Sequence, residues 1–165
     1  MEIKLLEPSD AEDYFRIRLE ALQDSPEAFV ASYQEEKAQT SEKYRNSFQS
    51  TESFTFGAFE KGKLIGTITL IREQRCKLRH RPNIVAMYVS PEKRGLGIGK
   101  ALVLEAINKA KVLEGVEQVY LTVVTTNQSA KKLYSSMGFT VYATEKKALK
   151  FDNTYFDEDF MILFI

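Results

Sequence analysis

Tryptophan is absent from this chain of 165 residues, and cysteine and histidine occur once each, as Cys76 and His80. A single cysteine excludes an internal disulfide, and one cysteine with one histidine supplies too few donors for a structural zinc cluster, so we predict no metal site. Cys76 is expected to be a small, partly buried side chain rather than a nucleophile. His80 lies among cationic residues and is expected on an exposed turn.

The chain also lacks an excess of charge, since 23 Lys and Arg residues balance 23 Asp and Glu residues. This balance gives no general attraction for nucleic acid or for an anionic membrane, and we expect neither partner. No apolar run approaches the length of a membrane span, and the stretch at residues 1–5 lacks the apolar core of a signal peptide. A cytoplasmic location is therefore expected. With 44% hydrophobic residues, residues 1–165 can form one domain with a full core.

Glycine is scarce, yet three of the eight glycines alternate within one short segment, at Gly95, Gly97 and Gly99. An apolar strand ending near Val89 runs into this segment, and the segment opens a helix. A helix start has free N–H groups and a partial positive charge, so residues without Cβ atoms allow a pyrophosphate to approach the backbone there. The pattern predicts an anion cradle; a flexible glycine-rich turn is the simpler alternative.

The spacing argues against two common phosphate-binding loops. A Walker A loop would need glycine where Arg94 stands and a Ser or Thr hydroxyl where Ala101 stands, which opposes a nucleotide-dependent phosphotransferase. A dinucleotide fingerprint would need its third glycine at Lys100. The pattern that remains is Arg-x-x-Gly-x-Gly, from Arg94 to Gly99.

A second segment, residues 127–139, reads Asn-x-x-Ala-x-x-Leu-Tyr-x-x-x-Gly-Phe. Together with Arg-x-x-Gly-x-Gly, and in the same order, it resembles the two hallmark motifs of the GNAT superfamily of N-acetyltransferases. The resemblance implies acetyl-CoA as the acetyl donor. It also implies a single-domain α/β (α+β) fold, in which a twisted, mixed and mostly antiparallel sheet of about seven strands is flanked by about four helices in the order β-α-α-β-β-β-α-β-α-β-β.

Residue patterns place these elements along the chain. Strands are expected at residues 3–6, 83–90 and 119–124. Two further strands are expected on either side of a turn at residues 60–63, and a final pair is expected at 139–149 and 155–164. Longer helices are expected from Pro8–Asp10, where Ser9 or Asp10 can cap, from about Leu96 to Leu113, and after the cap Asn127. Shorter helical pieces are expected near residues 26–31 and 41–48.

By the resemblance, the strand before the glycine loop parts from the strand that follows the next helix, and the pantetheine arm pairs with backbone groups of Met87 and Val89. The alternative is that this strand pairs only with a neighbouring strand. The residues predicted to bind the cofactor are Met87, Tyr88, Val89, Arg94, Gly95, Leu96, Gly97, Ile98, Gly99, Lys100 and Asn127.

Acetyl transfer needs a positioned amine, a donor for the developing oxyanion and a proton for the departing thiolate. The resemblance assigns the oxyanion to the N–H group of Val89. Tyr134 is the predicted catalytic acid, because a phenol is protonated at neutral pH. Its helical spacing alone would favour a core residue. Asn127 is expected to cap its helix and also to contact the cofactor.

The general base has no clear candidate, because no carboxylate occurs from Asn83 to Ser90, where some family members carry a glutamate. A water chain to a backbone carbonyl is one option. Side chains elsewhere are the other, and each is expected to be a solvated surface residue: Glu35, Glu36, Glu73 and His80.

We expect the acceptor site between the first helices and the last hairpin. Acidic and aromatic residues there favour a cationic amine: Glu35, Glu36, Asp152, Asp157, Glu158 and Asp159, with Tyr33, Tyr155 and Phe156. The main hypothesis is transfer of an acetyl group from acetyl-CoA to a primary amine, on a small molecule or a peptide, by direct attack in a ternary complex. The alternative is a coenzyme A-binding sensor or regulatory module without turnover. A homodimer is also considered, because dimers are common among relatives.

Overall fold

The computed structural model describes residues 1–165 as a seven-stranded sheet of order β1-β2-β3-β4-β5-β7-β6 with five α-helices. The strands are β1 (Glu2–Leu5), β2 (Ser53–Glu60), β3 (Lys63–Ile71), β4 (Asn83–Val89), β5 (Gln118–Val124), β6 (Thr140–Phe151) and β7 (Thr154–Phe164). The helices are α1 (Ala11–Asp24), α2 (Tyr33–Lys37), α3 (Glu42–Ser47), α4 (Ile98–Val112) and α5 (Gln128–Ser136). Neighbouring strands are antiparallel except β4 and β5, which are parallel.

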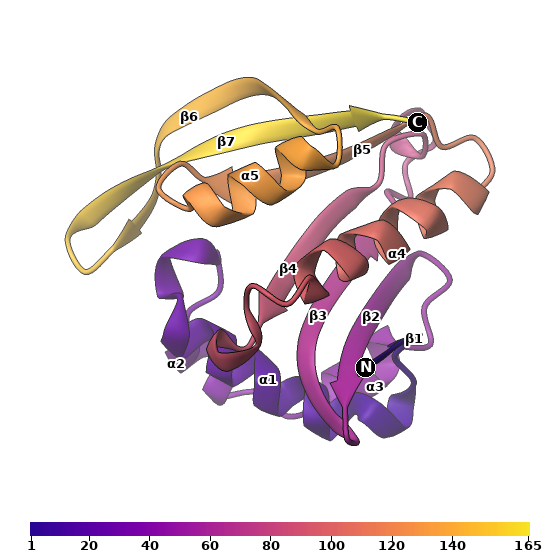
Figure 1. Cartoon of the computed structure of the whole chain (residues 1–165), viewed down its shortest axis with the longest axis vertical. Coiled ribbons are helices and arrows are strands. Elements are labelled where there is room, and N and C mark those ends of the chain that lie inside the picture. Colours follow the sequence, from indigo (N-terminus) through magenta and orange to yellow (C-terminus); the bar gives the residue numbers. More distant parts are fainter.

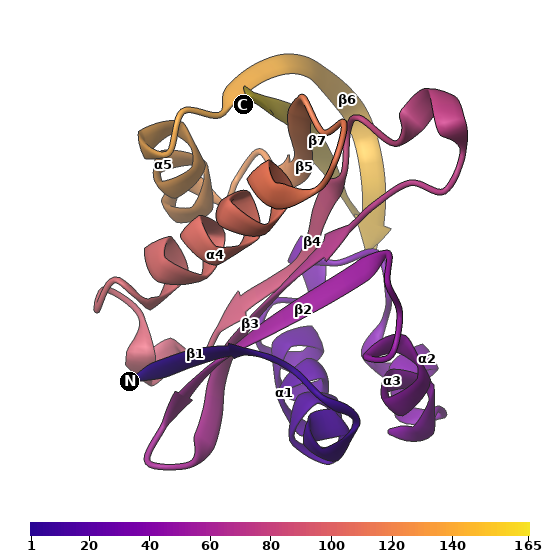
Figure 2. The ribbon, with the colours of Figure 1, turned by 90° about the vertical axis from the view of Figure 1, so that its right-hand side faces the viewer.

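Helices cover both faces of the sheet. Helices α4 and α5 lie on one face, and α1, α2 and α3 lie on the other (Figure 1 and Figure 2). The larger core lies under α4, where Leu102, Val103 and Ala106 belong to one buried cluster with residues of β2, β3, β4 and β5. A smaller core joins α1 to the opposite face through Tyr14 and Ile17. Burial of these apolar stripes holds the helices to the sheet.

The sheet is weakly joined at its centre. Strands β4 and β5 pair only at Asn83↔Tyr120 and Ile84↔Leu121, and no further residue pairs follow toward their carboxyl ends. The remainder of β4 stays paired with β3, and the remainder of β5 stays paired with β7. The two strands therefore part in the middle of the sheet, as the family resemblance implies.

A β-bulge in β4 accompanies this parting. Ala86 has φ +51°, a left-handed conformation that is unusual for a residue with a side chain. The register of β4 against β3 shifts between Thr67 and Thr69, and the Thr67 hydroxyl donates a hydrogen bond to the Ala86 carbonyl at 3.3 Å. The bulge redirects the end of β4 toward the glycine loop.

The expected fold class is confirmed, and two local expectations change. The piece expected near residues 41–48 is α3, but the piece expected near 26–31 is a 3-10 turn at Pro26–Ala28, and α2 follows it at Tyr33–Lys37, which brings the α-helices to five rather than about four. Cys76 is exposed rather than partly buried, since it lies in a short 3-10 turn outside the core. Gly138 has φ +96° and ends α5, as its sequence position predicts. None of the helices has the length and apolar character needed to span a lipid bilayer.

Candidate active site

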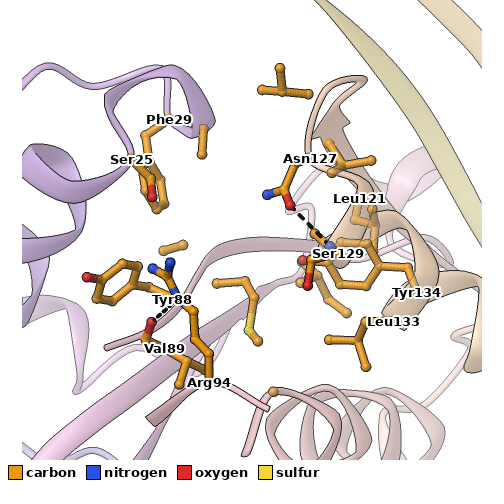
Figure 3. A pocket seen from close by; sticks show the side chains of 18 of the residues that line it. Ser25, Phe29, Tyr88, Val89, Arg94, Leu121, Asn127, Ser129, Leu133 and Tyr134 are labelled. Atoms are coloured by element: carbon orange, nitrogen blue, oxygen red, sulfur yellow. Dashed lines mark hydrogen bonds between the residues drawn. The ribbon is translucent and has the colours of Figure 1, made fainter. Parts of the chain in front are cut away.

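A cleft of about 580 Å³ lies where β4 and β5 part. Its floor and walls come from most of β4 and the carboxyl-terminal half of β5, from the glycine loop and the first turn of α4, and from the first two turns of α5 (Figure 3). A fourth segment, Ser25 to Phe29, closes it from the side of α1. All the residues predicted to bind the cofactor line this cleft except Leu96, whose side chain is exposed on the loop.

The glycine loop presents bare backbone to the cleft. Gly95 and Gly97 have φ +76° and +80°, and a Cβ atom added to either would meet no protein atom within 4 Å. The N–H groups of Gly95, Gly97 and Gly99 make no hydrogen bond within the protein, and the first helical bond of α4 is Ala101 N–H to the Gly97 carbonyl. Open space beside unpartnered amides at the positive end of a 15-residue helix is the environment that an anion requires.

Gly99 has a different role from the two glycines before it. A Cβ atom at Gly99 would lie 3.2 Å from Cδ2 of Leu133 and 3.2 Å from Cε of Met87. Its missing side chain therefore allows the start of α4 to approach both β4 and α5 closely. The glycine at this position shapes the cleft wall, whereas Gly95 and Gly97 leave room inside the cleft.

Arg94 lines the cleft, but its guanidinium already has partners. Its Nε donates to the Val89 carbonyl at 2.9 Å, and its Nη2 donates to Asp24 at 2.5 Å. The guanidinium also lies 5.5 Å from the centre of the Tyr88 ring. Burial opposes ionisation of Asp24, but hydrogen bonds from Arg94 and Ser25 outweigh it and lower the pKa of Asp24. Arg94 thus ties the glycine loop to the end of α1 and shares its charge with Asp24.

Tyr88, near the end of β4, also lines the cleft. Its hydroxyl donates to Oε1 of Glu20 at 3.2 Å, and the Ser90 hydroxyl donates to the same oxygen at 2.6 Å. Burial, followed by the negative charges of Glu20 and Asp24, raises the pKa of Tyr88. Tyr88 is therefore held toward α1 as a neutral phenol.

Asn127 begins α5 as predicted. Its Oδ1 accepts the Ala130 N–H at 3.1 Å, which satisfies one free donor of the first turn (Figure 3). The cap fixes the start of a short helix that carries Ser129, Leu133 and Tyr134 into the cleft wall.

Tyr134 combines burial with an unused hydroxyl. The side chain is only 6% exposed, packs edge-on against Phe139 at 6.0 Å between ring centres, and makes no hydrogen bond within the protein through its hydroxyl. Burial alone raises its pKa, so the phenol stays protonated at neutral pH. Its ring faces the cleft from α5, opposite Ser25 and Phe29 (Figure 3). The hydroxyl oxygen is not among the buried polar atoms without a partner, so it is accessible and free to bind a ligand.

The segment Ser25 to Phe29 is part of the site that the sequence patterns did not single out. It contributes Ser25, Glu27, Ala28 and Phe29 to the cleft, and Glu27 is the only carboxylate among the lining residues. The sequence predicted only a short helical piece near residues 26–31 without a role in the site, and the structure has a 3-10 turn at Pro26–Ala28.

Most of the acidic residues expected at the acceptor site are engaged elsewhere. Glu36 is buried and pairs with Lys43 and Tyr44, and Glu35 caps α2 through Ser32. Neither they nor the other proposed bases, Glu73 and His80, line the cleft. In the last hairpin, Asp157 binds Lys146 and Asp159 binds Lys131. Glu158 has no cationic partner.

Comparison with known proteins places this site in a family. The protein-family model described as "Acetyltransferase (GNAT) family" matches residues 15–139, which is more than half of the chain. The chain therefore belongs to the GNAT acetyltransferases, a family of acyltransferases, and the resemblance found in the two motifs is confirmed.

Particular relatives agree with this assignment. N-alpha-acetyltransferase MAK3 of Arabidopsis thaliana is 39% identical over 89 residues, which cover 51% of this chain and only 43% of that protein. The GNAT-family acetyltransferase structure from Streptococcus pneumoniae has a TM-score of 0.89, with 24% identity over 99% of this chain and 98% of its own. A GNAT superfamily phosphinothricin acetyltransferase from Sinorhizobium meliloti, solved with acetyl-CoA, has a TM-score of 0.83 and 24% identity. The match covers 99% of this chain and 88% of that chain. These two structures show the shared fold.

Proposed function

We propose that this protein transfers the acetyl group of acetyl-CoA to a primary amine by direct attack within a ternary complex. The observation that carries the proposal is the cleft between the parted strands, which has unpartnered loop amides at one end and the unpartnered Tyr134 hydroxyl within it. The first feature suits a pyrophosphate, and the second suits a leaving group that needs a proton. The structure from Sinorhizobium meliloti, solved with acetyl-CoA, supports the same donor here.

The residues would hold the donor as follows. The N–H groups around Gly95, Gly97 and Gly99 bind the pyrophosphate, and Met87 and Val89 pair with the pantetheine arm along the free edge of β4. Asn127, at the start of α5, contacts the donor from the opposite wall. The bound thioester supplies an activated acyl group, and the residues of the chain orient it toward the segment Ser25 to Phe29.

Two groups would then serve the transfer itself. The Val89 N–H is directed at the carbonyl oxygen, which becomes negative as the amine nitrogen forms its bond to the carbonyl carbon. Tyr134 donates its hydroxyl proton to the sulfur as the carbon–sulfur bond breaks. The acceptor nitrogen loses one proton to solvent and Tyr134 regains one from solvent, so the products are an amide and a free thiol and the phenol is restored. The raised pKa of Tyr134 keeps this proton in place before the reaction.

A thiol-release assay with acetyl-CoA and a panel of primary amines tests the proposal. We expect thiol release that depends on both the amine and the enzyme, and a mass increase of one acetyl group on the amine. Tight coenzyme A binding without thiol release from any amine would instead favour the coenzyme A-binding sensor.

A further inference from the structure

Two glutamates face each other across the last hairpin beside the cleft. Glu145 of β6 lies directly opposite Glu158 of β7, and Glu158 lies directly opposite Val124 of β5. Residues that are directly opposite in antiparallel strands share one face of the sheet, so the three side chains form one row. Val124 is itself a lining residue of the cleft. The row therefore brings two carboxylates to the edge of the cleft.

This pairing is unfavourable within the protein alone. Like charges directly opposite each other destabilise a strand pair, and neither glutamate makes an ion pair, whereas the adjacent Asp157 and Asp159 each bind a lysine. Burial and then the charge of Glu145 raise the pKa of Glu158. The negative charge of Glu145 and Glu158 is thus left uncompensated beside the cleft.

A third uncompensated carboxylate reaches the same region from the opposite wall. Glu27 lines the cleft and makes no ion pair, and its turn, Pro26–Ala28, packs against β5 and β6. The same cleft contains Tyr134, whose side chain is only 6% exposed and whose hydroxyl has no hydrogen-bond partner within the protein. A ligand that enters here thus meets one unused donor and three unused negative charges.

We propose that the acceptor carries a second positive charge, several bonds from the nitrogen that is acetylated, and that Glu27, Glu145 and Glu158 bind it. This inference rests on the proposed function, since it concerns the acceptor of that reaction. The attacking nitrogen must be neutral, so a single carboxylate-bound ammonium cannot also react. An acceptor with two amines separates the roles: one nitrogen stays protonated at the glutamates while the other attacks.

Binding of amines to the protein saturated with coenzyme A, measured by calorimetry, tests this without turnover. The probes are 1,5-diaminopentane, pentylamine and 5-amino-1-pentanol, which differ only in the group at the far end. We expect the diamine to bind about tenfold more tightly than the other two, as a partly buried charge pair allows. Glu158→Gln and Glu145→Gln should each remove most of this preference. Glu117→Gln, an exposed residue just before the opposite end of β5, is the matched control and should retain it.

The two proposals fail in different ways. Equal affinity for all three amines, or a preference that both glutamine variants keep, would overturn the second positive charge. Preferential diamine binding without any thiol release from acetyl-CoA would support the charge site and overturn the acetyl transfer. Glu145 is exposed, so its variant tests the idea even where Glu158→Gln lowers stability.

Discussion

Among single residues, Tyr134 separates chemistry from packing most clearly. Tyr134→Phe keeps the ring that contacts Phe139 and removes only the hydroxyl, which has no partner within the protein. We expect kcat to fall about 100-fold, in the range typical for loss of a general acid, with the coenzyme A affinity nearly unchanged. Steady-state kinetics and calorimetry measure the two quantities. Equal losses in both would assign Tyr134 a packing role instead.

Gly97 tests the anion cradle at the same scale. Gly97→Val places a side chain in the open space of the loop and imposes a left-handed φ on a β-branched residue, which costs about 1–2 kcal/mol of stability. We expect coenzyme A affinity to fall at least tenfold, by calorimetry. Gly62→Val is the matched control, because Gly62 has φ +77° and open surroundings in the turn between β2 and β3. It should lose similar stability and bind coenzyme A normally; if both variants bind alike, the cradle lies elsewhere.

At the scale of elements, the contact between Asp24 and Arg94 joins the end of α1 to the glycine loop. A double-mutant cycle with Asp24→Asn and Arg94→Gln, followed by urea unfolding, should give a coupling energy of about 0.5–1 kcal/mol, as expected for a partly exposed ion pair. The pKa of Asp24 is lowered in the folded state, so this contribution is present above the unfolded pKa, near 4. It is lost as the pH falls through the folded pKa. A coupling energy near zero at pH 7 would show that this ion pair does not join the two elements energetically.

The same scale shows which features the sequence could predict. The glycine spacing, the Asn127 cap and the Gly138 terminator are local signals, since each acts within one turn of its own position, and the structure contains all three. The partnership of Arg94 with Asp24 is not local, because the two residues are 70 positions apart and surface ion pairs leave no periodic pattern.

Two parts of the site had no usable signal for a similar reason. The bulge at Ala86 depends on how β4 pairs with β3, and alanine has no preference for a left-handed φ. Whether the acidic residues expected at the acceptor site carry an unpaired charge depends on their partners in space. Glu36 and Asp159 are neutralised by lysines from other elements, whereas Glu158 is opposed by another glutamate.

For the molecule as a whole, the sheet consists of two blocks, β1-β2-β3-β4 and β5-β7-β6, that share only two residue pairs. Helix α4 adds a second connection, because it packs across β2, β3 and β4 and belongs to the core that includes β5, and the turn Pro26–Ala28 adds a third by packing against β5 and β6. A cofactor arm in the gap would contact both blocks at once. Its binding should therefore reduce local opening in each block, although the two are far apart in sequence.

Hydrogen exchange with and without coenzyme A measures this effect. We expect added protection both at Met87 to Val89 and at Thr122 to Val124, and a rise in Tm of about 5–10 °C at a ligand concentration 100 times the Kd, since such binding adds about 2.7 kcal/mol. The amides of the hairpin turn at Gly62, far from the cleft, serve as the internal control. Protection confined to the glycine loop would mean that the pyrophosphate binds while the arm lies outside the gap, and the assignment of Met87 and Val89 would then be wrong.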